Sequence, residues 1–244
     1  MRWAFLMIKT LPSDEAKLLT FRHPSPAIQS QWKPFLAFGL FFTWLAGMGR
    51  YWDNPRAEWW QLLGLGSIAY VFALAFILWV LLAPLRPRHW SYRNVLLFIT
   101  LTAPPALLYA IPVERFMAPD AARAANAWLL GVVAAWRVAL LAVFLSRVAR
   151  LSRGVMVVAT LLPLTIIVVT LSILNLEHVV FDLMGGISPG EASANDTAYG
   201  IVVLLSMASF LLSPLLLIAY VLCITRAWKA AQPGAVVDTP SAPD

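Results

Sequence analysis

A stretch near the middle of the chain restricts the folds open to it more than any other feature. From Trp128 to Arg147 the sequence is almost wholly apolar, yet Arg137 stands at its midpoint. About 20 apolar residues are enough to cross the ~30 Å hydrocarbon core of a bilayer as an α-helix. We therefore expect a membrane-spanning helix that carries a cation near mid-depth. Because hydrocarbon offers no hydrogen-bond acceptors, other parts of the protein must solvate that cation.

Further apolar runs extend this expectation to the whole chain. Hydrophobic residues make up 61% of the sequence and charged residues only 12%, about half the ~25% that is usual in soluble proteins. The expected fold class is an all-α, polytopic membrane bundle whose one domain covers residues 32–229. Its six expected spans are residues 32–52, 60–82, 95–113, 127–148, 155–174 and 199–225. The strictly apolar part of the first, residues 35–49, is short, so a re-entrant segment is the alternative there.

Both ends of the chain are expected to lie outside the bilayer. Residues 1–31 form a cytoplasmic or interfacial segment, in which Pro12-Ser13-Asp14-Glu15 is typical of a helix start with Ser13 as the N-cap. The residues that follow would then form a short amphipathic helix on the membrane surface. Residues 230–244 contain three prolines and few large apolar side chains, which predicts a disordered cytoplasmic tail.

Basic residues divide unevenly between the two sides of such a bundle. If six spans alternate from a cytoplasmic N-terminus, thirteen of the 18 lysines and arginines fall on the cytoplasmic side. Four fall outside, namely Arg50, Arg56, Arg115 and Arg123. An excess of basic residues in cytoplasmic loops is the usual mark of membrane orientation. Both termini are therefore expected in the cytoplasm, and the membrane is the inner one if the organism is a bacterium.

Small residues indicate where helices could approach one another closely. In the fourth span they follow spacings of three and four: Gly131, Ala135, Ala139, Ala142 and Ser146. Such a stripe permits close helix packing, and Arg137 projects from the opposite side of the helix. We therefore expect protein or a polar cavity on both sides of this helix. A second close-packing face is expected at the start of the second span, at Gly64, Gly66 and Ser67.

Four prolines share the expected depth of Arg137: Pro104, Pro105, Pro163 and Pro214. A proline removes the hydrogen bond to the carbonyl four residues earlier. The carbonyls that should be exposed or need substitute donors are those of Thr100, Leu101, Ala159 and Phe210. Arg137 carries five N–H donors and no acceptor, which matches that need. Two interpretations stay open: a structural clamp that fixes the bundle, or a small polar cavity for an anionic ligand.

A second polar group is expected at the outer face, after the fifth and third spans: Glu177, His178, Asp182 and Glu114. His178 and Asp182 are four residues apart and share a helix face if the fifth span continues. A metal site needs three or four ligands, and only one histidine lies on this side, so no metal site is predicted here. The alternatives are ion pairs that pin the span ends, in which Glu114 and Glu177 meet Arg115, and general acid–base chemistry.

Three functions are compatible with these patterns. The first is a non-enzymatic subunit or scaffold of a membrane assembly, with the lipid bilayer and other membrane subunits as partners. The second is a small transporter or lipid-handling protein built on the Arg137 layer. The third is an outer-leaflet enzyme around Glu177, His178 and Asp182. No cofactor is expected, and the basic, aromatic loop from Arg86 to Arg93 predicts contact with anionic head groups rather than with nucleic acid.

Overall fold

The computed structural model describes residues 2–49, 52, 58–174 and 195–230. All regular structure in these ranges is helical, which confirms the expected all-α class. The expected tail is not tested, because residues 231–244 lie outside the described residues. The elements in chain order are α1 Arg2–Leu19, α2 Ala27–Ser30, α3 Trp32–Gly49, α4 Trp59–Leu62, α5 Leu65–Leu82, η1 Ala83–Leu85, α6 Tyr92–Leu101, η2 Pro104–Ala110, η3 Val113–Arg115, α7 Pro119–Arg147, α8 Arg153–Ile173 and α10 Asn195–Lys229.

Four segments are long and apolar enough to cross a membrane: Leu65–Leu85, Ala124–Arg147, Arg153–Ile173 and Leu204–Lys229. They coincide with the second, fourth, fifth and sixth expected spans, and they indicate an integral membrane protein. The first expected span corresponds to α3, which has 18 residues but begins with the amphipathic Trp32 and the basic Lys33. The third is divided, because α6 ends at Leu101 and the 3-10 helix η2 begins at Pro104, where the two prolines predicted a break.

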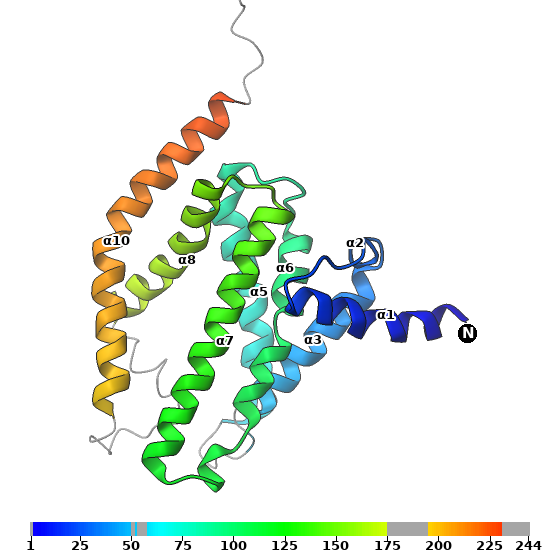
Figure 1. Ribbon diagram of the computed structural model, residues 1–244, viewed down its shortest axis with the longest axis vertical. Helices are drawn as coiled ribbons and strands as arrows, with labels where there is room; N and C mark the ends of the chain where they lie inside the picture. Colours follow the sequence, from blue (N-terminus) through cyan, green and yellow to red (C-terminus); the bar gives the residue numbers. More distant parts are fainter. Residues whose placement is uncertain (1, 50–51, 53–57, 175–194, 231–244) are drawn as a thin grey trace, which may run out of the picture.

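The helices form an elongated bundle, and α1 projects sideways from it, with its C-terminal end at the bundle (Figure 1). On one side α3 contacts α5, α6 and η2, and on the other α10 packs chiefly against α8. Three polar contacts hold α10 to the bundle. The hydroxyls of Ser206 and Ser172 are 2.8 Å apart, Tyr220 donates to the Leu81 carbonyl, and Trp228 donates to the Pro84 carbonyl at 3.2 Å. The outward face of α10 is left apolar, as lipid requires.

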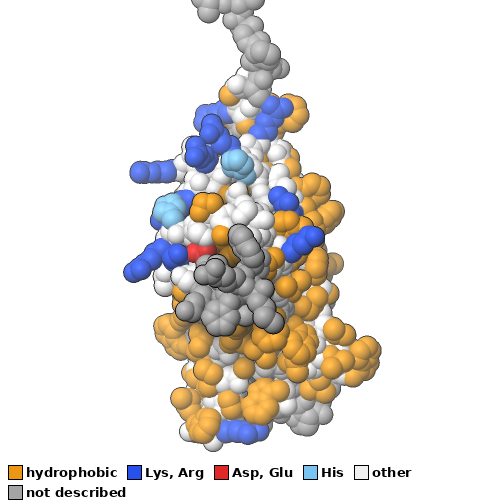
Figure 2. Space-filling model, turned by 90° about the vertical axis from the view of Figure 1, so that its right-hand side faces the viewer, with side chains coloured by type: hydrophobic (Ala, Val, Ile, Leu, Met, Phe, Trp, Pro, Cys, Tyr) orange, Lys and Arg blue, Asp and Glu red, His pale blue; other side chains and the backbone are white. Residues whose placement is uncertain are grey.

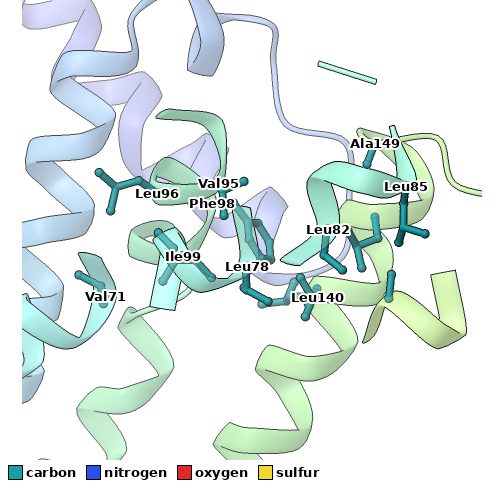
Figure 3. Close-up of a cluster of buried hydrophobic side chains, with 14 residues drawn as sticks. Val71, Leu78, Leu82, Leu85, Val95, Leu96, Phe98, Ile99, Leu140 and Ala149 are labelled. Atoms are coloured by element: carbon teal, nitrogen blue, oxygen red, sulfur yellow. The ribbon is translucent and has the colours of Figure 1, made fainter. Parts of the chain in front are cut away.

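The largest buried cluster joins α5, α6, α7 and α8 (Figure 3). Leu82 and Leu145 are completely buried within it. Phe98 of α6 stacks on Phe144 of α7, with ring centroids 4.2 Å apart. Other members of the cluster, including Leu85 and Ala149, lie just beyond the ends of α5 and α7. The core therefore also holds in place the loops that follow these two helices.

Helices α3 and α5 approach each other closely where glycines replace larger side chains, at the face that was expected for the second span. A Cβ atom on Gly64 would lie 2.7 Å from the Trp44 carbonyl oxygen, and the φ angle of Gly64 is +65°, which favours glycine. A Cβ on Gly47 of α3 would lie 2.6 Å from the Ser67 hydroxyl oxygen. The α3–α5 contact is thus tight, as predicted. A comparable contact joins α3 to α6, where a Cβ on Gly39 would lie 2.8 Å from Thr100.

The small-residue stripe on α7 behaves differently from the prediction. Most of it does not pack against another part of the described chain: nothing lies within 4 Å of a Cβ placed on Gly131, and Ala135, Ala139 and Ser146 are exposed, whereas Ala142 is half-buried. The expectation of protein or a polar cavity on both sides of α7 is therefore not met by the part of the chain that the structure describes. The reason is that α7 buries its larger apolar residues instead, including Val133 and Leu140.

Gly39→Ala is expected to destabilise the protein by about 1–3 kcal/mol, the range for overpacking a tight contact, because the new methyl group would collide with Thr100. Gly131→Ala is the matched control. It adds a methyl group in open space within a helix, so it should be neutral or slightly stabilising. Thermal unfolding of both variants in detergent measures the difference, and equal stabilities would contradict the tight α3–α6 contact.

Candidate functional site

Arg137 lies on the inward side of α7, opposite the small-residue stripe. Its side chain is half-buried, and Val133 and Leu140, one turn to either side, are buried. Within the described ranges no hydrogen bond or ion pair of Arg137 is present. Arg137 therefore lies on the helix face that packs against the bundle, and no partner for its five donors is present among the described residues. Whether it clamps the bundle or binds a ligand stays a prediction.

Two of the four carbonyls that the prolines were expected to expose accept hydrogen bonds from local donors. The Thr100 carbonyl accepts from the Ala103 N–H at 3.1 Å, and the Phe210 carbonyl accepts from the Ser213 hydroxyl at 3.1 Å. The Thr100 hydroxyl, which is fully buried, donates back to the carbonyls of its own helix. Pro163 is buried inside α8, whereas Pro214 is exposed on α10. These prolines are therefore not gathered into one enclosed layer, because one of them faces outward.

The outer acidic group is largely outside the described residues. Glu177, His178 and Asp182 fall in the stretch 175–194, and although Glu114 belongs to η3, its side chain is likewise not described. The neighbouring Arg115 stacks over the ring of Trp52 at 4.9 Å. The ion-pair, metal and acid–base interpretations of this group thus stay untested.

The N-terminal segment is a helix that starts earlier than expected. α1 runs through Pro12 without a break, so the prediction of a helix start with Ser13 as the N-cap is wrong. The acidic residue after Ser13 has another role: Asp14 pairs with Lys17 at 2.8 Å and accepts hydrogen bonds from the backbone and hydroxyl of Ser25. The carboxylate therefore ties the end of α1 to the loop that follows it.

Two hydrogen bonds anchor the end of α1 to α7. The indole N–H of Trp136 donates to the Leu19 carbonyl at 2.9 Å, and the Arg147 guanidinium donates to the Phe21 carbonyl at 2.5 Å. Leu18 and Leu19 also pack against the main core cluster. α1 is thus a docked part of the fold.

Glu15 is a buried carboxyl group on the docked side of α1. It is 4% exposed, and neither carboxylate oxygen has a hydrogen-bond partner among the described residues. Leu11 and Leu18, which share its helix face, pack on the cluster that contains Phe35. Burial away from water raises the pKa of Glu15 from 4.5 to about 8. The spacing of residues 11, 15 and 18 was the signal in the sequence that could have predicted this burial.

The most distinctive polar site is a cavity of about 460 Å³ at the end of the bundle where α5, α7 and α10 finish and α8 begins. Its lining includes four arginines: Arg86, Arg88, Arg150 and Arg226. They come from three separate segments, which two hydrogen bonds hold together. The Arg88 N–H donates to the Ala149 carbonyl at 3.0 Å, and the Trp228 indole N–H donates to the Pro84 carbonyl of η1. The sequence predicted head-group contact for the Arg86–Arg93 loop alone, and Arg150 and Arg226 were missed because they are distant in the chain.

Raising the pH is expected to weaken the fold through Glu15. The folded protein keeps this carboxyl protonated up to about pH 8, whereas an unfolded chain releases the proton near 4.5. Stability should therefore fall as pH rises from 5 to 8, by roughly 5 kcal/mol at most, since each pKa unit corresponds to about 1.4 kcal/mol. Glu15→Gln should remove most of this slope in thermal unfolding measured from pH 5 to 9.

The adjacent Asp14→Asn serves as its control. Hydrogen bonds from Lys17 and Ser25 outweigh the burial of Asp14, and the pKa of this carboxyl lies below 3.8. Asp14 is therefore ionised throughout pH 5 to 9, so its loss should lower stability without changing the slope. If Glu15→Gln keeps the full slope of the original protein, the buried carboxyl is not its source.

No protein-family model, curated protein or solved structure matches this chain. Its function must therefore be inferred from its own residues. The relevant features are four membrane-capable helices, an outward stripe of small residues on α7, and an arginine-lined cavity at one end.

Proposed function

We propose that this chain is a non-enzymatic subunit of a membrane assembly, and that it crosses the bilayer six times with both termini in the cytoplasm. The single observation that carries the subunit role is the outward stripe of small residues on α7. The directions and lengths of the helices support the number of crossings. The distribution of charge supports the orientation.

The directions of α5 and α7 support a crossing between them. The ends of both helices lie at the arginine-lined cavity, so the two run the same way along the bundle. A chain that crosses twice in the same direction must return in between, and only α6, η2 and η3 are available for the return (Figure 1). The ten residues of α6 and the seven of η2 extend about 15 Å and about 14 Å respectively. Together they approach the ~30 Å of a hydrocarbon core.

α3 supplies the remaining crossing in this proposal. Its 18 residues extend about 27 Å as an α-helix. It packs on α5, α6 and η2 over its length, with Phe35 buried near its start and Ala46 near its end. A short, well-packed span can be completed by interfacial aromatic residues at its ends, here Trp32 and Trp52.

The charge distribution supports the orientation. Figure 2 shows lysine and arginine side chains gathered toward one end of the visible face, above a long hydrophobic surface. The cavity arginines belong to this end, as does Arg147 at the end of α7. The opposite end includes Arg115 in η3. A basic end that faces the cytoplasm is the usual arrangement.

The exposed stripe on α7 is a surface suited to another helix. Lipid tails pack as well on large apolar residues as on small ones, so a stripe of small residues on an exposed face offers the bilayer no advantage. A second helix gains from it, because small side chains let two backbones approach closely. We assign this stripe to a transmembrane helix of another subunit.

Cysteine labelling tests the orientation and the three crossings that follow η3. In a Cys223→Ser background, Met117→Cys lies before α7 and Lys229→Cys at the end of α10. The proposal expects a membrane-impermeant maleimide to label Met117→Cys in intact cells and Lys229→Cys only after the membrane is opened. Labelling of both positions from the same side would refute the odd number of crossings between them, and labelling of Lys229→Cys alone in intact cells would refute the orientation.

Photo-crosslinking tests the subunit role. A photoreactive residue at Ala139, within the stripe, is expected to give a discrete protein adduct in native membranes. Ala134 is the matched control position, because it is also an exposed alanine but lies about 100° from the centre of the stripe. The same photoreactive residue there is expected to give lipid adducts only. Lipid adducts from both positions would mean that α7 faces the bilayer and that no partner helix occupies the stripe.

A further inference from the structure

The arginine-lined cavity has a volume suited to a ligand rather than to a single ion. Its volume of about 460 Å³ lies within the roughly 300–1,000 Å³ of small-molecule sites. It is a partly open pocket lined by the loops after α5 and α7, the first turn of α8 and the last turns of α10. Four structural elements thus converge on one space, and the buried core beneath the loops holds them there.

The lining of this cavity carries an excess of positive charge. Within the described residues the one ion pair is that between Lys17 and Asp14, so none of the four arginines is neutralised by a carboxylate. Arg86 is held over the ring of Trp228 at 4.1 Å, which fixes its position without cancelling its charge. All four arginines are exposed, so water solvates them when no ligand is bound, and an anion among them would replace that water with charged hydrogen bonds.

The backbone at this site is arranged to present these side chains. Arg86 and Arg150 both have φ angles in the left-handed region, at 52° and 53°. L-residues rarely adopt this conformation, because the Cβ atom then lies too close to the backbone. Hydrogen bonds hold both turns: the Arg86 N–H donates to Ala83, and the Leu151 N–H donates to Leu145, each at 3.0 Å.

The start of α8 adds backbone donors to the same cavity. The first bond within the helix is from the Met156 N–H to the Ser152 carbonyl, so the N–H groups of residues 153–155 have no acceptor inside the helix. The Ser152 side chain does not cap them. Gly154 and Val155 line the cavity, and a Cβ on Gly154 would meet nothing within 4 Å. These donors and the helix dipole reinforce the arginines.

We propose that this cavity binds a phosphate-bearing anion at the level of the lipid head groups. Guanidinium groups bind phosphate oxygens through paired hydrogen bonds, and four of them can surround one or two phosphate groups. The site lies where apolar spans give way to a basic surface, which is the depth of phospholipid head groups. The same chemistry would accept a soluble phosphate compound, so the source of the phosphate is decided by experiment. The proposal is independent of the number of crossings and of any partner subunit.

Cys223 provides a probe of occupancy in the unaltered protein, because it is the only cysteine in the sequence and it lines the cavity. The protein is purified in neutral detergent, and its rate of modification by maleimide is measured. Short-chain phosphatidylglycerol, phosphatidylcholine, inorganic phosphate or pyrophosphate is then added. Protection by phosphatidylglycerol alone assigns the site to an anionic lipid. Protection by phosphate or pyrophosphate assigns it to a soluble phosphate compound. No protection by any phosphate-bearing anion, or equal protection by phosphatidylcholine, overturns the proposal.

A charge-matched pair of variants then tests the arginines. Arg88→Gln combined with Arg150→Gln removes two cavity charges, and protection should require at least roughly tenfold more ligand, since charged hydrogen bonds are strong. Arg22→Gln combined with Lys33→Gln removes two exposed charges that do not line the cavity, and protection should be unchanged. An equal loss of Cys223 protection in both double variants would mean that the overall positive charge of the surface attracts the ligand, and it would also overturn the proposal. The wild-type protection assay does not depend on the folding of any variant.

Discussion

A hydrocarbon solvent leaves backbone amides without partners, and that constraint dictates most of what this chain does. Each apolar run must satisfy its own N–H and C=O groups, so it forms a helix. Where prolines interrupt this pattern, the chain supplies a substitute locally. The Ala103 N–H bonds the Thr100 carbonyl, and the Ser213 hydroxyl bonds the Phe210 carbonyl. Local repair of this kind lets α10 continue through Pro214, whereas the double proline ends α6 and starts η2.

The same solvent explains why charge is concentrated at one end. Arginines that lie outside the bilayer can be hydrated, and they collect where α5, α7 and α10 end. Arg137 is the exception, and α7 places it on the face that packs against the bundle while its small residues face outward. The helix thereby separates its two unusual features, a cation on the inner side and a close-packing stripe on the outer side. The first needs solvation by the chain, and the second is available to another molecule.

Sequence periodicity correctly predicted which residues share one face of a helix, but it did not predict which other helix, if any, that face contacts. The second-span glycines were expected to pack closely and do so against α3, but most of the equivalent stripe on α7 packs against nothing in the described chain. Spacing defines a side of a helix and not what lies opposite it, so the two stripes could not be told apart in advance. Four of the expected spans appear as membrane-capable helices for a related reason: length and hydropathy are local properties. The cavity could not be predicted, since its arginines come from three segments that meet only through the tertiary fold.

The two bonds that fasten α1 to α7 have a consequence for biosynthesis. Leu19 and Phe21 leave the ribosome well before their partners, Trp136 and Arg147, which are translated more than a hundred residues later. Until the fourth hydrophobic segment has been delivered, those early carbonyls have no indole or guanidinium to meet. The contacts of the α1 end with α7 therefore form late, whereas Leu11 and Leu18 can pack on the Phe35 cluster before α7 has been made.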